Sequence, residues 1–303
     1  MRQLWMTVLS FLLIFLLLAA LPLPTLAAGE APVAENLELK TYCNVSVGGR
    51  LSAFDPDGEV CGYTITTAPV KGDIALQSDG SFLYTPREDR RGRDYFGYKA
   101  ADAQGNYSQE ATAIIRIDRQ KKGVRYADMT GRSDEYAALA LSELDLFTGV
   151  RIGGVYCFEP EHTVSRGEFL SMCMCLADKP VYAAVYRTGY RDDAEIPLWL
   201  KGYASSAAAE DLYRGLETTE GPVFGAAEPI SKAQAAELLN RALGLSDVRD
   251  VPAYDMPDGR QAQACANLEA CGILSGSVPT EAPLRRAEAA EMLVAAKELL
   301  DRR

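Results

Sequence analysis

Three basic side chains recur at equivalent points of a repeated pattern and could bind an anion. Arg166, Lys232 and Arg286 each fall in the first turn of an expected helix, where the helix macrodipole disfavours a cation. Three such placements in one chain indicate a shared task. Because backbone donors at a helix N-terminus already attract anions, the added cation predicts a carboxylate or phosphate site. A structural salt bridge is the alternative interpretation.

The residues beside these cations predict how the helices begin. In a capping box, a hydroxyl and a side chain three residues later satisfy each other's free backbone donors. We interpret the neighbouring polar residues as such caps rather than as ligands. The expected capping residues are Ser165, Glu168, Ser231, Gln234 and Glu288. Arg285 stands where the third helix would need a hydroxyl, so this cap is expected to be lost.

A longer pattern surrounds each of these helix starts and indicates three repeats. Each unit opens with an aromatic-plus-acid element, continues with an amphipathic helix and a small-residue turn, and ends with a loop and a second helix. The opening elements are Tyr126-Ala127-Asp128, Tyr190-Arg191-Asp192 and Tyr254-Asp255-Met256. The units span 126–178, 190–245 and 251–300, after a polar linker at 119–125. Recurrence at this length predicts a stacked or pseudo-symmetric helical array.

The preceding segment, residues 31–118, has the pattern of a β domain. Short alternating runs such as Ser81-Phe82-Leu83-Tyr84 are separated by turn clusters such as Asp55-Pro56-Asp57-Gly58. Several short strands at regular spacing predict a small antiparallel sandwich. The chain is therefore expected to be multidomain, with an all-β module followed by helices.

The β segment resembles the bacterial cadherin-like and Ig-like repeats of surface proteins. The resemblance rests on Asp55-Pro56-Asp57-Gly58, on the run from Asp79 to Pro86, and on Asp94-Tyr95-Phe96-Gly97-Tyr98. Some of these relatives bind calcium with loop carboxylates, which makes Asp55, Asp57 and Asp94 candidate ligands. The alternative is that these aspartates only serve turns, because a calcium site needs about six to eight oxygen donors.

The helical units resemble the S-layer homology repeat through the order aromatic-x-Asp, helix, turn, Phe-x-Pro and Ser-Arg-x-Glu. This resemblance implies a pseudo-threefold bundle whose grooves bind secondary cell-wall polysaccharide, often through a pyruvylated amino sugar. Carried over, it places Arg166, Lys232 and Arg286 on the acidic sugar, with Trp199 and Tyr136 at the aromatic position. Lysine and glutamine in the second unit depart from the family's arginine and glutamate, so fewer than three grooves could work.

The N-terminus predicts export. Arg2, the apolar run from Val8 to Ala20 and the small residues up to Ala28 match a secretory signal peptide over residues 1–28, with an uncleaved anchor as the alternative. We expect a secreted chain at the bacterial cell surface that leaves the membrane after cleavage. The net charge of -11 gives no electrostatic footprint for nucleic acid.

An oxidising exterior would permit disulfides among the seven cysteines. Cys43 and Cys61 share the predicted β domain and could form a bridge. Cys157 with Cys173 or Cys175, and Cys265 with Cys271, are further possible pairs. An odd count leaves at least one thiol free or paired between chains.

These observations predict a non-catalytic surface protein that is anchored to wall polysaccharide and displays a β module with a protein or glycan ligand. No cofactor is expected apart from calcium. A secreted cell-wall or glycan-active enzyme is one alternative, although His162 is the only histidine available for a nucleophilic triad. An adhesin whose repeats are purely structural is the other.

Overall fold

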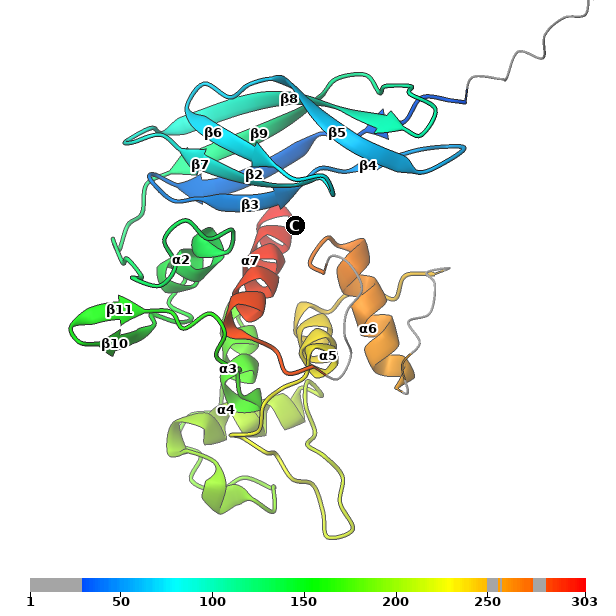
Figure 1. Ribbon diagram of the computed structural model, residues 1–303. Coiled ribbons are helices and arrows are strands. Elements are labelled where there is room, and N and C mark those ends of the chain that lie inside the picture. The colour runs from blue at the N-terminus through cyan, green and yellow to red at the C-terminus, as the bar shows by residue number, and fades with distance from the viewer. Residues whose placement is uncertain (1–28, 250–255, 257, 275–281) are drawn as a thin grey trace, which may run out of the picture.

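The computed structural model describes residues 29–249, 256, 258–274 and 282–303. The predicted signal peptide and the Tyr254-Asp255 element lie outside these residues. The N-terminal β domain lies against one end of a helical region (Figure 1). No helix in the described ranges is long and apolar enough to cross a membrane.

The β domain contains two main sheets. The four-stranded sheet has the order β2 (Leu37–Tyr42), β9 (Ala111–Asp118), β8 (Gly92–Asp102), β5 (Val60–Thr67). The three-stranded sheet has the order β3 (Val47–Arg50), β7 (Ser81–Pro86), β6 (Gly72–Leu76). The short strands β1 (Val33–Ala34) and β4 (Ala53–Phe54) pair separately. Strand β2 runs parallel to β9, whereas the other pairs are antiparallel. The prediction of a purely antiparallel sandwich is therefore wrong for this one pair.

Period-two alternation fills the interior of the sandwich, because successive strand residues point to opposite faces. Along β9, alternate residues from Ala111 to Ile117 are buried. Phe82 of one sheet meets Phe96 of the other edge to face, with ring centroids 5.3 Å apart. The resulting core is separate from that of the helical region.

The helical region is built from three successive helix pairs. These are α2 (Glu135–Glu143) with α3 (Arg166–Leu176), α4 (Leu198–Ala209) with α5 (Lys232–Leu243), and α6 (Gly259–Ala270) with α7 (Arg286–Arg302). A small hairpin, β10 (Val150–Ile152) and β11 (Val155–Cys157), projects between α2 and α3 (Figure 1), and the 3-10 turn η1 (Asp193–Glu195) precedes α4. The hairpin was not expected from the sequence.

The two domains contact each other directly. The backbone N–H of Gly48 donates to the carbonyl of Ser133 at 2.9 Å, and a Cβ at Gly48 would come within 2.6 Å of the Ser133 Cβ. Tyr42 packs on Tyr136 with ring centroids 5.2 Å apart. The expected polar linker is also hydrogen-bonded to α2, since the backbone N–H groups of residues 121 and 122 donate to the Glu143 carboxylate.

The predicted Cys43–Cys61 disulfide is wrong, because both thiols are free. Cys61 lies in β5 and Cys43 directly follows β2, and these strands form opposite edges of the four-stranded sheet. Three strand spacings separate the edges, or roughly 14 Å. A disulfide requires Cα atoms within about 7 Å. The other five cysteines are also free.

Candidate functional site

The starts of the second helices meet in a closed cycle of backbone hydrogen bonds. The N–H of Val164 donates to the carbonyl of Leu284, that of Leu284 to Ile230, and that of Ile230 to Val164, at 2.9, 2.8 and 3.0 Å. All three side chains are buried. Each residue comes from a different helix pair, so the cycle relates α3, α5 and α7 to one another around a common centre.

The cations that follow this cycle lie at the junctions between units. Arg166 is only 4% exposed, and its Nη1 donates to the carbonyls of Phe224 and Gly225 at 3.0 and 2.9 Å. Arg286 is 8% exposed, and its Nη1 donates to the carbonyl of Phe158 at 2.6 Å and to Glu159 Oε2 at 3.2 Å. Each guanidinium therefore binds the loop of the next unit in the cycle.

An aromatic ring covers each of these buried guanidinium groups. The Arg286 guanidinium lies 4.7 Å from the ring centroid of Phe147, and that of Arg166 lies 5.8 Å from the ring centroid of Tyr213. A guanidinium within about 6 Å of a ring gains cation–π attraction. Burial also raises the pKa of the Tyr213 hydroxyl to about 12. Both arginines are thus enclosed between oxygen acceptors of the neighbouring loop and an aromatic face.

The acids of the opening elements hold the loops that receive the arginines. Asp128 accepts the backbone N–H groups of Phe158 and Glu159 at 2.8 and 2.7 Å. Asp192 accepts the equivalent groups of Phe224 and Gly225, both at 2.8 Å. Sequence reasoning found these acids as a repeated motif without assigning them this role.

Lys232 occupies the third junction in a different environment. Its Nζ pairs with Glu288 Oε1 at 2.5 Å, and Glu288 also binds the Arg285 guanidinium at 2.8 Å. These partners lower the pKa of Glu288 to about 2 against the opposing effect of burial. Among the described residues, Lys232 therefore binds only a carboxylate, Arg286 binds one carbonyl oxygen and one carboxylate, and Arg166 binds two carbonyl oxygens. A polysaccharide contact by the three cations stays a prediction.

The helix starts carry the expected caps in two cases. The structure contains complete capping boxes between Ser165 and Glu168 and between Ser231 and Gln234. At the start of α7, Glu288 accepts the backbone N–H of Arg285 at 3.0 Å. A guanidinium has no acceptor, so the reciprocal half of that box is missing.

The two predicted aromatic positions lie in different places. Tyr136 is half-buried between the domains beside Tyr42, and burial raises the pKa of its hydroxyl well above the usual range. Trp199 lies on α4, is 58% exposed, and packs edge to face with Tyr203 at 6.3 Å. Only Trp199 presents an open ring of the kind expected for a sugar.

The three aspartates proposed for calcium do not fit a shared metal site. The two carboxylate oxygens of Asp94 accept the backbone N–H groups of Val70 and Lys71 and the hydroxyl of Tyr84 at 2.7 to 3.0 Å, so both are used within the fold. Asp55 instead accepts the N–H of Asp57. Among the described residues, no group of three His, Cys, Asp or Glu side chains is placed to hold a metal ion. The alternative interpretation, that the aspartates serve turns, fits Asp94, because its carboxylate accepts the backbone N–H groups of the turn at Val70 and Lys71.

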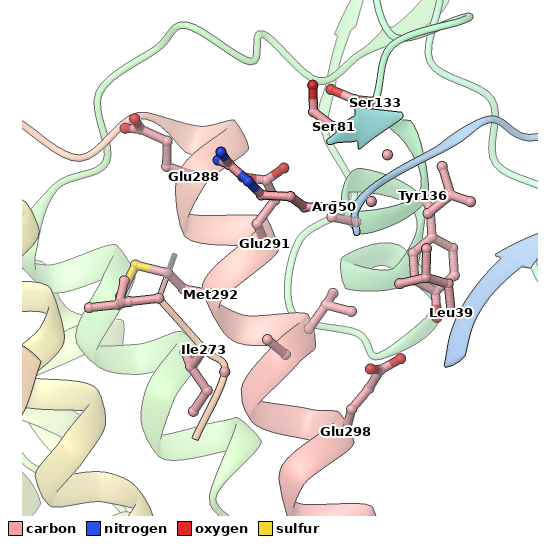
Figure 2. A pocket seen from close by; sticks show the side chains of 18 of the residues that line it. Leu39, Arg50, Ser81, Ser133, Tyr136, Ile273, Glu288, Glu291, Met292 and Glu298 are labelled. Carbon is pink, nitrogen blue, oxygen red and sulfur yellow. The ribbon is translucent and has the colours of Figure 1, made fainter. Parts of the chain in front are cut away.

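A cleft of about 890 Å³ lies between the β domain and the helical region. Figure 2 shows Leu39, Arg50 and Ser81 on its β side and Glu288, Glu291 and Met292 along α7. Glu291 lines this cleft, and the surrounding protein, Asp134 and Glu288 raise its pKa to about 7. Glu291 is exposed to the cleft, but the protein on both sides of the cleft reduces the solvation of its carboxylate. Sequence reasoning missed this site, because the strands on one side and α7 on the other are more than 200 residues apart in the chain.

Comparisons with known proteins recognise the β domain. Residues 29–119 match the bacterial cadherin-like domain, a segment shorter than half of the chain. No curated protein matches the chain.

Solved structures resemble the chain only weakly. The SrpA adhesin from Streptococcus sanguinis is 16% identical with a TM-score of 0.27, covering 34% of this chain and 65% of the adhesin chain. The fibronectin(III)-like modules of Clostridium thermocellum CbhA are 16% identical with a TM-score of 0.23, covering 32% of this chain and 51% of theirs. The chain spans less than two thirds of the adhesin chains that it matches. Similarity at this level says nothing about function. The family match shows that residues 29–119 form a bacterial cadherin-like domain.

Proposed function

We propose that the protein is a non-catalytic cell-surface protein whose helical region binds secondary cell-wall polysaccharide and whose cadherin-like domain serves adhesion or spacing. The cyclic arrangement of the three helix starts supports this proposal most strongly. Resemblance to the S-layer homology repeat implies a pseudo-threefold bundle, and a cycle of three equivalent backbone contacts is what such a bundle requires. The match to a bacterial cadherin-like domain is consistent with a location outside the cell.

The buried arginines give this arrangement its rigidity. Arg166 and Arg286 bind carbonyl oxygens across the junctions, so their first task is to hold neighbouring units together. An acidic sugar would have to approach through the remaining exposed donors. We therefore assign the recognition of the polysaccharide mainly to exposed side chains of α4, rather than to all three cations equally.

The exposed aromatic side chains around α4 are the surface that best fits a sugar. Trp199 and Tyr203 are four residues apart and share one helix face. Tyr182 and Tyr186 are exposed, and their backbones contact α4 through Ser206 and Lys201. Aromatic rings present a flat apolar face with a polar edge, which suits one side of a sugar ring.

A second candidate function is an adhesin whose repeats are structural only. The observation that favours it is the use of Arg166 and Arg286 inside the fold, because a group bound on several sides has less capacity for a ligand. In that case the cadherin-like domain alone would bind the partner, a protein or a glycan. The two functions differ in whether the helical region contacts the wall.

Replacing Trp199 by alanine is expected to weaken binding to purified wall polysaccharide about tenfold, which corresponds to about 1.4 kcal/mol, within the range that a buried aromatic contact contributes. Binding isotherms on immobilised polysaccharide measure this change. Tyr107→Ala is the matched control, because Tyr107 is also 58% exposed but lies in the cadherin-like domain. Equal loss in both variants, or no loss at Trp199, would remove α4 from the binding surface.

A further inference from the structure

Among the described residues, the third junction differs from the other two because its cation lines the interdomain cleft. After each first helix, two successive N–H groups bond to one carbonyl of that helix, which makes Phe147, Tyr213 and Leu274 equivalent. Phe147 and Tyr213 cover a guanidinium, but Leu274 has no aromatic face to offer Lys232. Leu274 and Lys232 instead line the interdomain cleft, which the β domain covers from the other side.

One carboxylate in this cleft has no ionic partner. Glu288 is paired with Lys232 and Arg285, and Glu298 with Lys40 at 3.6 Å. Glu291 has no ion pair or hydrogen bond in the part of the chain that the structure describes. Partial burial and the nearby acids Asp134 and Glu288 disfavour the ionised form of Glu291. Arg285 and Arg132 favour the ionised form, but their effect is smaller. A cation beside Glu291 would relieve this imbalance.

The rest of the cleft combines apolar and hydrogen-bonding surface. Leu39, Leu83 and Met292 supply apolar walls. The side chains of Gln77 and Ser133 also line it and make no hydrogen bond within the described ranges. Arg50 reaches over the cleft (Figure 2) and has only a long, exposed contact of 3.8 Å to Asp79. A volume of about 890 Å³ lies within the ordinary range for small-molecule sites.

We propose that this cleft binds an amino sugar through a protonated amine placed on Glu291, with the sugar ring between the β domain and α7. The protonated amine supplies the positively charged partner that the Glu291 carboxylate lacks among the described residues. The hydroxyl groups meet the free hydrogen-bonding groups of Gln77, Ser133 and Arg50, and the apolar side of the ring meets Leu39 and Leu83. An alkyl amine would use the carboxylate but leave these polar side chains unused. The assignment stands apart from wall anchoring, because no residue of α4 takes part.

Calorimetric titration of the full chain at pH 7 tests this assignment with three probes. The first is the β-1,4-linked dimer of glucosamine, the second is its N,N′-diacetylated form, and the third is 1,5-diaminopentane. We expect the free-amine dimer to bind at least tenfold more tightly than either of the others. Glu291→Gln should weaken the binding of that dimer at least tenfold, because a charge-assisted hydrogen bond becomes a neutral one.

Glu210→Gln is the control, since Glu210 is an exposed carboxylate at the end of α4. It should leave the affinity for the dimer unchanged. Glu291 has no ionic partner in the described residues, so its replacement should leave the fold intact, which thermal unfolding checks. Absence of binding, equal affinity for the acetylated dimer or the diamine, or equal affinity of the folded Glu291→Gln variant would each overturn the assignment. None of these results bears on the loss of wall binding in Trp199→Ala.

Discussion

Replacing Arg166 by alanine is expected to lower the free energy of unfolding by about 3 kcal/mol, and replacing Arg286 by alanine should have a similar effect. Each change leaves one buried carbonyl oxygen and one partly buried acceptor without their charged donor, and opens space beneath an aromatic ring. A hydrogen bond from a charged group contributes about 1.5–3 kcal/mol, and the cation–π contact adds about 0.5–2 kcal/mol. Urea unfolding followed by circular dichroism measures these values.

Two further variants make this expectation specific. Lys232→Ala should cost about 1 kcal/mol, because Lys232 has a single carboxylate partner among the described residues and is only partly buried. Arg191→Ala removes a mostly exposed ion pair with Glu220 and should change stability by less than about 0.5 kcal/mol. If the Arg166 and Arg286 variants were no less stable than the Arg191 variant, the guanidinium contacts would not hold the units together.

Replacing Leu284 by alanine is expected to destabilise the protein by about 3–4 kcal/mol. Leu284 is fully buried, and its N–H and carbonyl both belong to the cycle of hydrogen bonds that joins the three helix starts. Loss of its side chain leaves a cavity at the one point where all units meet, so neighbouring residues cannot close it by moving independently.

Leu216→Ala provides the comparison for this effect. Leu216 is 45% exposed in the second unit, so the same chemical change should cost less than about 1 kcal/mol. Denaturant midpoints and slopes of the two variants separate the cases, provided that the slope is unchanged. Equal destabilisation would mean that the cycle is not a central packing point of the helical region.

Local sequence rules predicted the features that depend on neighbouring residues. The turn residues and alternation placed the β domain, and the capping boxes at Ser165 and Ser231 placed two helix starts where the structure has them. Repetition also identified Asp128 and Asp192 as equivalent residues. These signals are short-range, because a cap or an alternating strand leaves its pattern within a few residues.

Contacts between distant segments could not be predicted in the same way. No spacing in the sequence indicates that Arg286 binds the carbonyl of Phe158, because a backbone acceptor leaves no residue signature. The expected disulfide failed since shared membership of a domain does not set the distance between its edge strands. The cleft around Glu291 arises only when β2, β3 and β7 lie over α7.

The location of the arginines changes how the repeated cations are interpreted. Their unfavourable position in the helix dipole is compensated by carbonyl oxygens and aromatic rings of the next unit. A shared task therefore exists, and in the structure it is the joining of units. Recognition of an anionic sugar would be an additional role, for which Lys232 is the cation with the greatest access, because its side chain is the least buried of the three.

Binding of the full chain to purified bacterial walls, before and after chemical removal of their secondary polysaccharide, tests the central proposal most directly. Sedimentation of protein with the walls gives the bound fraction. We expect most of the protein to sediment with native walls and to remain in solution with stripped walls, and we expect Tyr107→Ala to behave like the unmodified chain. Equal binding to both wall preparations, or no binding to native walls, would contradict anchoring through the polysaccharide.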